Sequence, residues 1–187
     1  MDKRKTVGTN KYKNAHQEMI VKANQILATS SFLDLTFQNL SKNSNYSKTT
    51  IYFHFNSNIN FLYQDVLNSF RNEIYSIVSK QNNENPRNFI LEIYKKIFEY
   101  IDMNPNLYKN LFLIALILSG TEYKTKDLVT PLLNDATLKL NKKLDFQDHW
   151  SRFTAHSIQY AISNNLDEKK RIKESFNRSL NSILNYK

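Results

Sequence analysis

The sequence predicts an all-α protein, and three observations carry that prediction. Apolar residues recur three and four positions apart along most of the 187-residue chain, which is the spacing of one apolar helix face. Only 2 glycines and 3 prolines interrupt it, so the connections between helices are expected to be short. No segment alternates apolar and polar residues as a half-buried strand does.

Positive charge is concentrated ahead of the first predicted helix. Residues 1–60 hold eight of the 26 Lys and Arg side chains against three of the 17 Asp and Glu, and five of those eight precede residue 14. This stretch, which includes Lys11 and Lys13, has no apolar periodicity and is expected to be an unstructured arm. It is either an arm that contacts DNA, as in homeodomain-type proteins, or a solubilising tail.

The first helix is predicted from about Asn14 to Ser31, with a single buried face. Two short helices follow it. Thr36 is suited to cap one that runs to about Lys42, and Ser47 is suited to cap the next, because a hydroxyl can accept from backbone N–H groups there. Between them, Asn45 is expected to adopt the left-handed conformation of a tight turn. This arrangement is a helix-turn-helix.

A long helix over about 58–81 is predicted to lead from this N-terminal part, residues 1–57, into an all-helical C-terminal part, residues 58–187. Asn104-Pro105 separates the next two helices, because proline disfavours helix in the residue before it. The second of these is apolar on nearly all sides from Leu111 onward, so it is expected to be buried all round. Another helix is expected over about 127–144.

The last two predicted helices, about 146–164 and 167–185, favour a dimer. The first of them carries two apolar stripes and can bury two faces, whereas the second has one apolar seam. One stripe consists of Trp150, Phe153, Tyr160 and Ala161, and the other of Ala155, Ile158 and Ile162. Pairing with their copies across a two-fold axis would form a four-helix bundle. The alternative is that both stripes pack within one subunit.

Composition excludes several classes of function. With Gly8 and Gly120 the only glycines, the sequence has no P-loop, dinucleotide fingerprint or nucleophile elbow. Without cysteine it has no thiolate metal site and no sulfur nucleophile. No nucleophile–base pair or metal constellation occurs at a usable spacing, so no enzyme activity, cofactor or metal is expected. The longest apolar run, Leu111–Leu118, is too short to span a membrane, and the first residues lack a signal-peptide pattern, so a cytoplasmic protein is expected.

The segment 36–55 resembles the helix-turn-helix of the TetR family of bacterial transcriptional regulators. Thr36 stands where the family has the Thr or Ser that opens its second helix, and Leu40-Ser41 matches its Ile-Ala pair. Tyr46-Ser47 matches a Val-Ser entry, and Ile51-Tyr52-Phe53-His54-Phe55 matches a Leu-Tyr-x-His-Phe ending. The spacing agrees throughout. The resemblance implies an N-terminal DNA-binding domain and a C-terminal ligand-binding and dimerisation domain.

Three positions depart from the family pattern. Ser31 and Asn45 stand where glycines are usual, and Asn58 stands where a Lys usually begins the fourth helix and meets phosphate. We expect the turn to survive the first two changes. The loss of a charged phosphate contact at Asn58 is expected to weaken DNA binding.

The resemblance also implies roles for individual residues. It places Lys48, Thr49 and Thr50 in the first turn of the recognition helix, where they would read base edges in the major groove. Ser47 belongs to the same surface, although its type favours a cap over a DNA contact. Phosphate contacts are implied for Thr36, Tyr46, Tyr52 and His54. Core packing is the alternative for Tyr52, and a hydrogen-bonded turn histidine is the alternative for His54. Phe53 and Phe55 are expected to pack against the first and fourth helices.

At the level of the whole protein, the resemblance implies a homodimer on a palindromic double-stranded DNA operator. It also implies repression that is relieved by a small-molecule effector bound among the central helices. Aromatic candidates for that pocket are Tyr94, Phe98, Tyr108, Phe112, Trp150 and Phe153, with plain core packing as the alternative. A second hypothesis for the function is a protein-interaction module of the same fold that has lost specific DNA binding.

Overall fold

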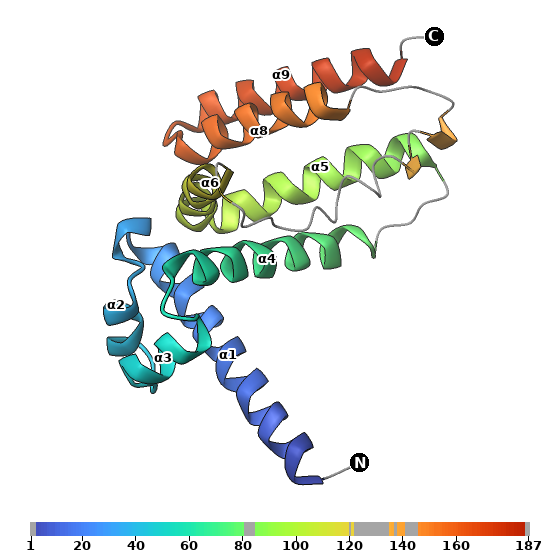
Figure 1. Ribbon diagram of the computed structural model, residues 1–187. Helices are drawn as coiled ribbons and strands as arrows, with labels where there is room; N and C mark the ends of the chain where they lie inside the picture. The colour runs from blue at the N-terminus through green and yellow to red at the C-terminus, as the bar shows by residue number, and fades with distance from the viewer. Residues whose placement is uncertain are drawn as a thin grey trace. The chain divides into compact units, whose positions relative to one another are not determined.

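The computed structural model describes residues 3–80, 85–119, 121, 135–136, 138–140 and 146–185. Within these residues every regular element is a helix (Figure 1). In chain order they are α1 (Lys3–Thr29), the 3₁₀ helix η1 (Phe32–Asp34), α2 (Phe37–Lys42), α3 (Lys48–His54), α4 (Ile59–Val78), α5 (Pro86–Met103), α6 (Pro105–Ser119), α8 (Phe146–Ile162) and α9 (Leu166–Asn185). The predicted all-α class is confirmed for this part of the chain. Most of the helix expected over 127–144 lies outside the described residues.

The chain forms two compact units. Of the described residues, those up to Ser69 and those from Asn110 to Thr121 belong to unit 1, and the others belong to unit 2. The division therefore falls inside α4 and inside α6, and residue 57, where the sequence suggested a boundary, lies within unit 1.

The core of unit 1 joins α1 to the short helices and to the first half of α4. Its buried apolar side chains include Met19, Ala23 and Leu27 from α1, Leu40 from α2, Ile51 from α3, the adjoining Phe55, and Leu62 and Val66 from α4. Each is completely inaccessible to solvent. At about 1.5–3 kcal/mol for each large aliphatic or aromatic side chain, this burial stabilises α2 and α3, which are too short to be stable alone.

The N-terminal arm is helical, so the prediction of an unstructured arm is wrong. Helix α1 begins at Lys3 rather than near Asn14. Tyr12 contacts the rings of Phe53 and His54 on α3, at centroid distances of 6.1 and 4.2 Å. Tertiary contact therefore extends the stable part of α1, and the Lys and Arg residues before it are good helix formers. Apolar periodicity does not indicate the early start of α1, because the single aromatic residue Tyr12 supplies the contact with α3.

The turn between α2 and α3 closes without a left-handed residue, so the expectation for Asn45 is wrong. In the described residues, positive φ values occur at Asn56 (49°) and Ser57 (55°), after α3. The Ser41 hydroxyl donates to the Tyr46 carbonyl over 2.9 Å and fixes the α2–α3 turn. Because only residues 55–58 separate α3 from α4, the chain must turn sharply there, and Asn56 is of a residue type that tolerates the left-handed conformation.

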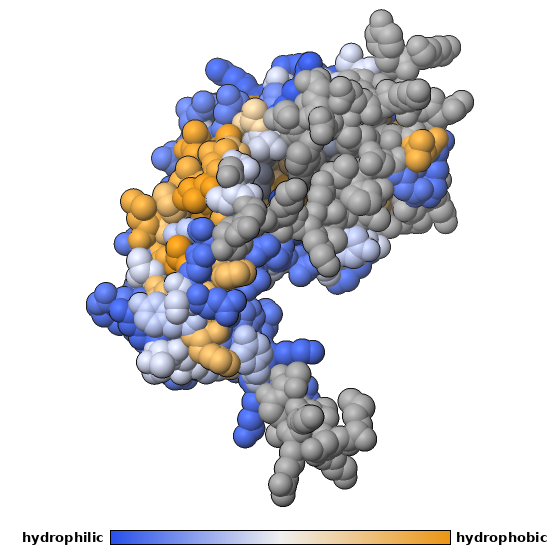
Figure 2. Space-filling view, in the orientation of Figure 1, coloured by the Kyte–Doolittle hydropathy of each residue, from blue (hydrophilic) through white to orange (hydrophobic). Residues whose placement is uncertain are grey.

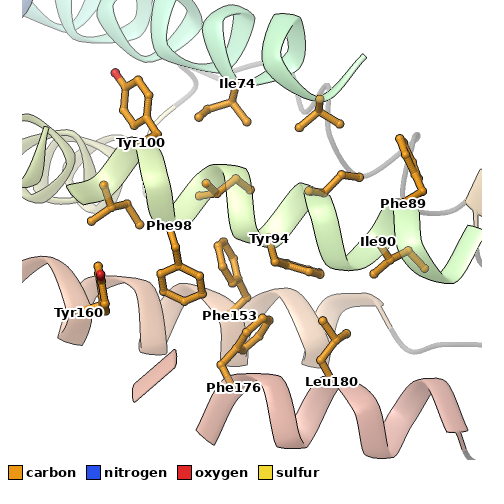
Figure 3. Packing of buried hydrophobic residues seen from close by; sticks show 14 of the residues in the cluster. Ile74, Phe89, Ile90, Tyr94, Phe98, Tyr100, Phe153, Tyr160, Phe176 and Leu180 are labelled. Carbon is orange, nitrogen blue, oxygen red and sulfur yellow. The ribbon is translucent and has the colours of Figure 1, made fainter. Parts of the chain in front are cut away.

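The core of unit 2 is built around α5, which buries two faces (Figure 3). Tyr100 lies on the side of α5 that meets Ile74 of α4, whereas Tyr94 and Phe98 point to α8 and α9. From these helices Phe153 and Phe176 complete an aromatic cluster, with Tyr94 to Phe153 at 4.7 Å and Phe98 to Phe176 at 5.8 Å between ring centroids. Burial raises the pKa of the Tyr94 hydroxyl far above its usual range.

Helix α6 is buried on one face only, so the prediction of a helix buried on all sides is wrong. Leu111, Ile114 and Leu118 recur at helical spacing and are at most 3% exposed. On the opposite face Leu116 is 54% and Ile117 is 43% exposed. Figure 2 shows hydrophobic side chains gathered over this helix. An apolar sequence on all sides does not specify burial where the fold supplies neighbours for one side only.

The last two helices are present as α8 and α9, an antiparallel pair lying side by side (Figure 1). Phe153, Tyr160 and Ala161 of α8 are buried within unit 2, whereas Ala155 is exposed and Ile162 is 57% exposed. The third member of the stripe that contains Ala155 and Ile162 is Ile158, which is half-buried, so this stripe is only partly covered within unit 2. No helix among the described residues combines the length and the apolarity that a membrane crossing requires.

Candidate nucleic-acid interface

Two hydroxyl caps define α2 and α3, as the sequence predicts. The Thr36 hydroxyl accepts from the Asn39 backbone N–H over 3.1 Å, and the Ser47 hydroxyl accepts from that of Thr50 over 3.1 Å. Each cap satisfies one of the N–H groups that a helix leaves unpaired at its start. The Thr50 hydroxyl also lies 2.9 Å from that of Ser47. Thr36 and Ser47 are therefore engaged in holding the two helices in place.

The first turn of α3 presents Lys48 and Thr49 to solvent. The Lys48 ammonium lies over the face of the Tyr52 ring, 5.5 Å from its centre. Thr50 is half-buried beside its cap. Of the three predicted base-reading residues, Lys48 and Thr49 are the ones open to a partner.

Tyr52 and Phe53 exchange the roles that the sequence suggests. Tyr52 is half-buried and packs edge-on against Phe37 of α2, at 5.0 Å between ring centroids. The sequence predicts that Phe53 packs against the first and fourth helices. Its ring does meet Tyr12 of α1 edge-on, at 6.1 Å between centroids, but the side chain is 72% exposed and is not part of the core. Phe55, by contrast, is completely buried.

His54 ends α3 inside a stack of rings rather than on an open surface. Its ring lies 4.2 Å from Tyr12 at an angle of 11°, and 5.5 Å from the ring of His16. It is 9% exposed, and no described group hydrogen-bonds its buried Nδ1. Burial lowers the pKa of His54, and the neighbouring His16 lowers it further. His16 in turn lies 3.1 Å, Nε2 to Oδ2, from Asp65 of α4.

Tyr46 leads into α3 and is held by α1. Its hydroxyl donates to the Glu18 carboxylate over 2.5 Å. That hydrogen bond, together with partial burial and the negative charge of Glu18, raises the pKa of Tyr46. Sequence reasoning treated Tyr46 as a free phosphate donor and did not consider Glu18, because the two residues are 28 positions apart.

The remaining predicted DNA contacts lie on α1 and at the start of α4. Lys11 and Lys13 are exposed on α1, either side of the Tyr12 that contacts α3. Asn58 caps α4, since its side-chain oxygen accepts from the Asn60 N–H over 3.0 Å. The amide at this position thus has a structural use that a Lys would not share.

The aromatic candidates for an effector pocket do not form one set. Tyr94, Phe98 and Phe153 pack on one another in the core of unit 2, where Tyr108 shares a 2.7 Å hydrogen bond with Ser157. Phe112 belongs to unit 1, and the side chain of Trp150 lies outside the described residues. Phe98 also lines an open groove of about 470 Å³ between α5 and α9, with Lys173 among its other walls.

Each unit contains one polar cluster that links its own helices and that the sequence did not indicate. Asn110, on α6, is 1% exposed, and its amide donates to the carbonyls of Leu27 and Ser30, each over 2.7 Å. In unit 2 the Tyr160 hydroxyl donates to both oxygens of Asp102, at 2.6 and 2.7 Å. Burial alone would raise the pKa of Asp102, but Tyr160 and Lys173 together lower it. These groups satisfy one another and act as structural links.

Comparison of the chain with protein families, curated proteins and solved structures gives no match. Within the part of the chain that the structure describes, no three His, Asp or Glu side chains are grouped so that they could hold a metal ion. The features of unit 1 that bear on function are therefore the exposed first turn of α3 and the adjoining part of α1.

Proposed function

We propose that this protein is a sequence-specific DNA-binding transcriptional regulator of the TetR type. The observation that carries the proposal is the pair of capped short helices, with Lys48 and Thr49 exposed on the first turn of α3. A helix entering the major groove reads bases with the residues of its first turns, and Lys and Thr supply the donors and the methyl group for such contacts.

The charge of unit 1 supports the same partner. The net charge of the chain is +9, and Lys11 and Lys13 are exposed on α1, where Tyr12 keeps that stretch against the last turn of α3. Cations beside a recognition helix neutralise phosphates and make affinity fall with salt. A helical extension pays less ordering entropy on binding than a free arm does.

A homodimer that represses from a palindromic operator completes the proposal. The stripe of α8 that consists of Ala155, Ile158 and Ile162 is the face that we assign to the second copy, because Ala155 and Ile162 are exposed. A small-molecule effector would act in unit 2, and the groove that contains Phe98 and Lys173 is a candidate space for it. The effector must bind one arrangement of the dimer more tightly than the other in order to release DNA.

The test is a titration of the full-length chain against duplex from the DNA flanking its own gene and against random duplex, at fixed salt. We expect selective binding to the flanking duplex. Lys48→Ala should weaken that selective binding about tenfold, because a good side-chain contact to a base edge contributes about 1–3 kcal/mol. Lys170→Ala, which removes an exposed cation of α9, is the matched control and should change little. Equal binding to both duplexes would contradict the proposal.

A protein-interaction module is the second candidate, and one observation favours it. Phe53 exposes 72% of its surface on α3, and a large exposed aromatic side chain on a short helix is typical of protein contacts. Phe53→Ser distinguishes the two functions. It should leave DNA binding nearly unchanged under the first proposal, whereas loss of a protein partner together with absent DNA selectivity would favour the second.

A further inference from the structure

A groove of about 470 Å³ runs between one face of α1 and the turn that leads into α3. Asn14, Gln17, Glu18 and Lys22 line it from α1, and Ser44 and Tyr46 line it from the turn. These positions of α1 are three and four residues apart, so they share one helix face. Amides, hydroxyls and an ammonium are the donors that proteins direct at the phosphates of nucleic acids.

Glu18 is the one carboxylate among the described residues that line this groove. Lys22 follows it by one helical turn, yet its ammonium donates to Gln25 over 3.0 Å, and no described cation forms an ion pair with Glu18. The carboxylate instead accepts the Tyr46 hydroxyl over 2.5 Å. The carboxylate of Glu18 is therefore exposed, has no described cation beside it, and is hydrogen-bonded to Tyr46, which leads into α3.

We propose that Glu18 competes with DNA for Tyr46, and that this groove is a contact surface for the phosphate backbone. The inference rests on the proposed function. In the free protein the Glu18 carboxylate accepts the hydrogen bond from the Tyr46 hydroxyl that a phosphate oxygen would accept in the complex. A duplex must displace it and bring phosphate close to a like charge, so Glu18 lowers affinity for every sequence alike.

This competition changes how the binding free energy is divided between phosphate contacts and base contacts. A chain with a net charge of +9 binds any duplex through its cations, and such binding carries no sequence information. A carboxylate that opposes phosphate contacts lowers this common part of the affinity, while the base contacts of Lys48 and Thr49 are unaffected. The ratio of affinities for two sequences stays the same, but the base contacts of α3 then supply a larger share of the total binding free energy.

The experiment uses full-length chains and a labelled random-sequence duplex at several salt concentrations. Glu18→Gln removes the charge and keeps an oxygen that can accept from Tyr46, so the fold should be retained. Glu174→Gln, an exposed carboxylate of α9, is the control for net charge. We expect E18Q to bind the random duplex about three- to tenfold more tightly than wild type at low salt, and E174Q to bind as wild type does.

A second arm tests Tyr46 directly. Tyr46→Phe should weaken duplex binding more strongly in the E18Q chain, where a neutral amide oxygen holds the hydroxyl only weakly, than in the wild-type chain, where the hydroxyl must first leave the carboxylate. Equal affinities of E18Q and E174Q, or an equal effect of Y46F in both chains, would overturn the inference while leaving the proposed function intact. If neither wild type nor E18Q binds any duplex, the proposed function fails and the inference fails with it.

Discussion

The ring of His54 joins α3 to the rest of unit 1 through ring stacking. It stacks on Tyr12 of α1 and lies 5.5 Å from His16 of the same helix, and His16 in turn meets Asp65 of α4. A buried ring whose Nδ1 has no described partner is accommodated best when it is neutral. The stack therefore fixes α3 against α1 only while His54 stays unprotonated.

This arrangement predicts that acid destabilises the protein through His54. Its pKa is lowered on folding, by burial first and by His16 second, so the unfolded chain, with a pKa near 6.5, binds the proton more readily. The free energy of unfolding should accordingly fall as pH drops through about 6.5 toward the folded-state value. Denaturant unfolding between about pH 7.5 and 5.5 measures the slope.

Two substitutions identify the group responsible for that slope. His54→Gln should flatten the dependence of the unfolding free energy on pH, although it lowers stability at every pH by loosening the stack. His156→Gln, on α8, changes a histidine of unit 2 and should leave the slope as it is in wild type. A slope that is unchanged in H54Q would show that other groups govern the acid response.

At the level of the elements, helix ends explain how unit 1 is assembled. Thr36, Ser47 and Asn58 cap α2, α3 and α4 from their own N-termini, whereas α1 ends against another helix. There the Asn110 amide donates to the carbonyls of Leu27 and Ser30 and its oxygen accepts the Phe32 N–H over 3.1 Å. One buried side chain of α6 thus pairs three backbone groups at the α1–η1 junction.

Asn110→Ala should therefore lower the free energy of unfolding by about 2–4 kcal/mol, because it leaves buried backbone groups unpaired. Asn110→Asp should not restore stability, since a carboxylate can accept from Phe32 but cannot donate to the two carbonyls. Asn177→Ala, at an exposed position of α9, makes the same chemical change where the amide is not buried. Equal stabilities of N110A and N177A in denaturant unfolding would refute this account.

The elements also show which parts of the fold can be predicted from sequence. Caps are local, so Thr36 and Ser47 predicted the starts of α2 and α3 correctly, and Pro105 marked the start of α6. The early start of α1 and the exposed face of α6 depend on neighbours distant in sequence. A pattern of residue types contains no information about which side of a helix the fold will cover.

The same distinction applies to the candidate interface. Lys48 and Thr49 follow the cap directly, so their exposure on the first turn of α3 could be expected. Glu18 contacts Tyr46, which leads into α3, and Tyr12 contacts His54 at the end of that helix, from positions on α1 that no spacing rule connects to α3. The aromatic residues offered for a pocket were ambiguous because core packing uses the same residue types.

For the whole molecule, a second copy can pack only against apolar side chains that are not already buried within one subunit. The seam of α9, with Phe176, Leu180 and Leu184, is buried within unit 2, so it is not free to join a second copy. The stripe of α8 that contains Ala155 and Ile162 is left open. Under the proposed function a dimer places two copies of α3 in successive major grooves, about 34 Å apart.

Ile162→Glu should consequently separate the dimer without unfolding the chain, because it places a charge in an apolar contact between copies while the residue is 57% exposed in one subunit. Sedimentation should give twice the chain mass of 22.1 kDa for wild type and the single mass for the variant. Asn72→Glu adds the same charge at an exposed position of α4 and should sediment as wild type does. Binding to a palindromic duplex should weaken in I162E, because a monomer binds each half-site separately, whereas a dimer that has bound one half-site is held close to the other. A wild-type chain that sediments as a monomer, or an I162E chain that remains dimeric, would exclude this stripe of α8 as the interface.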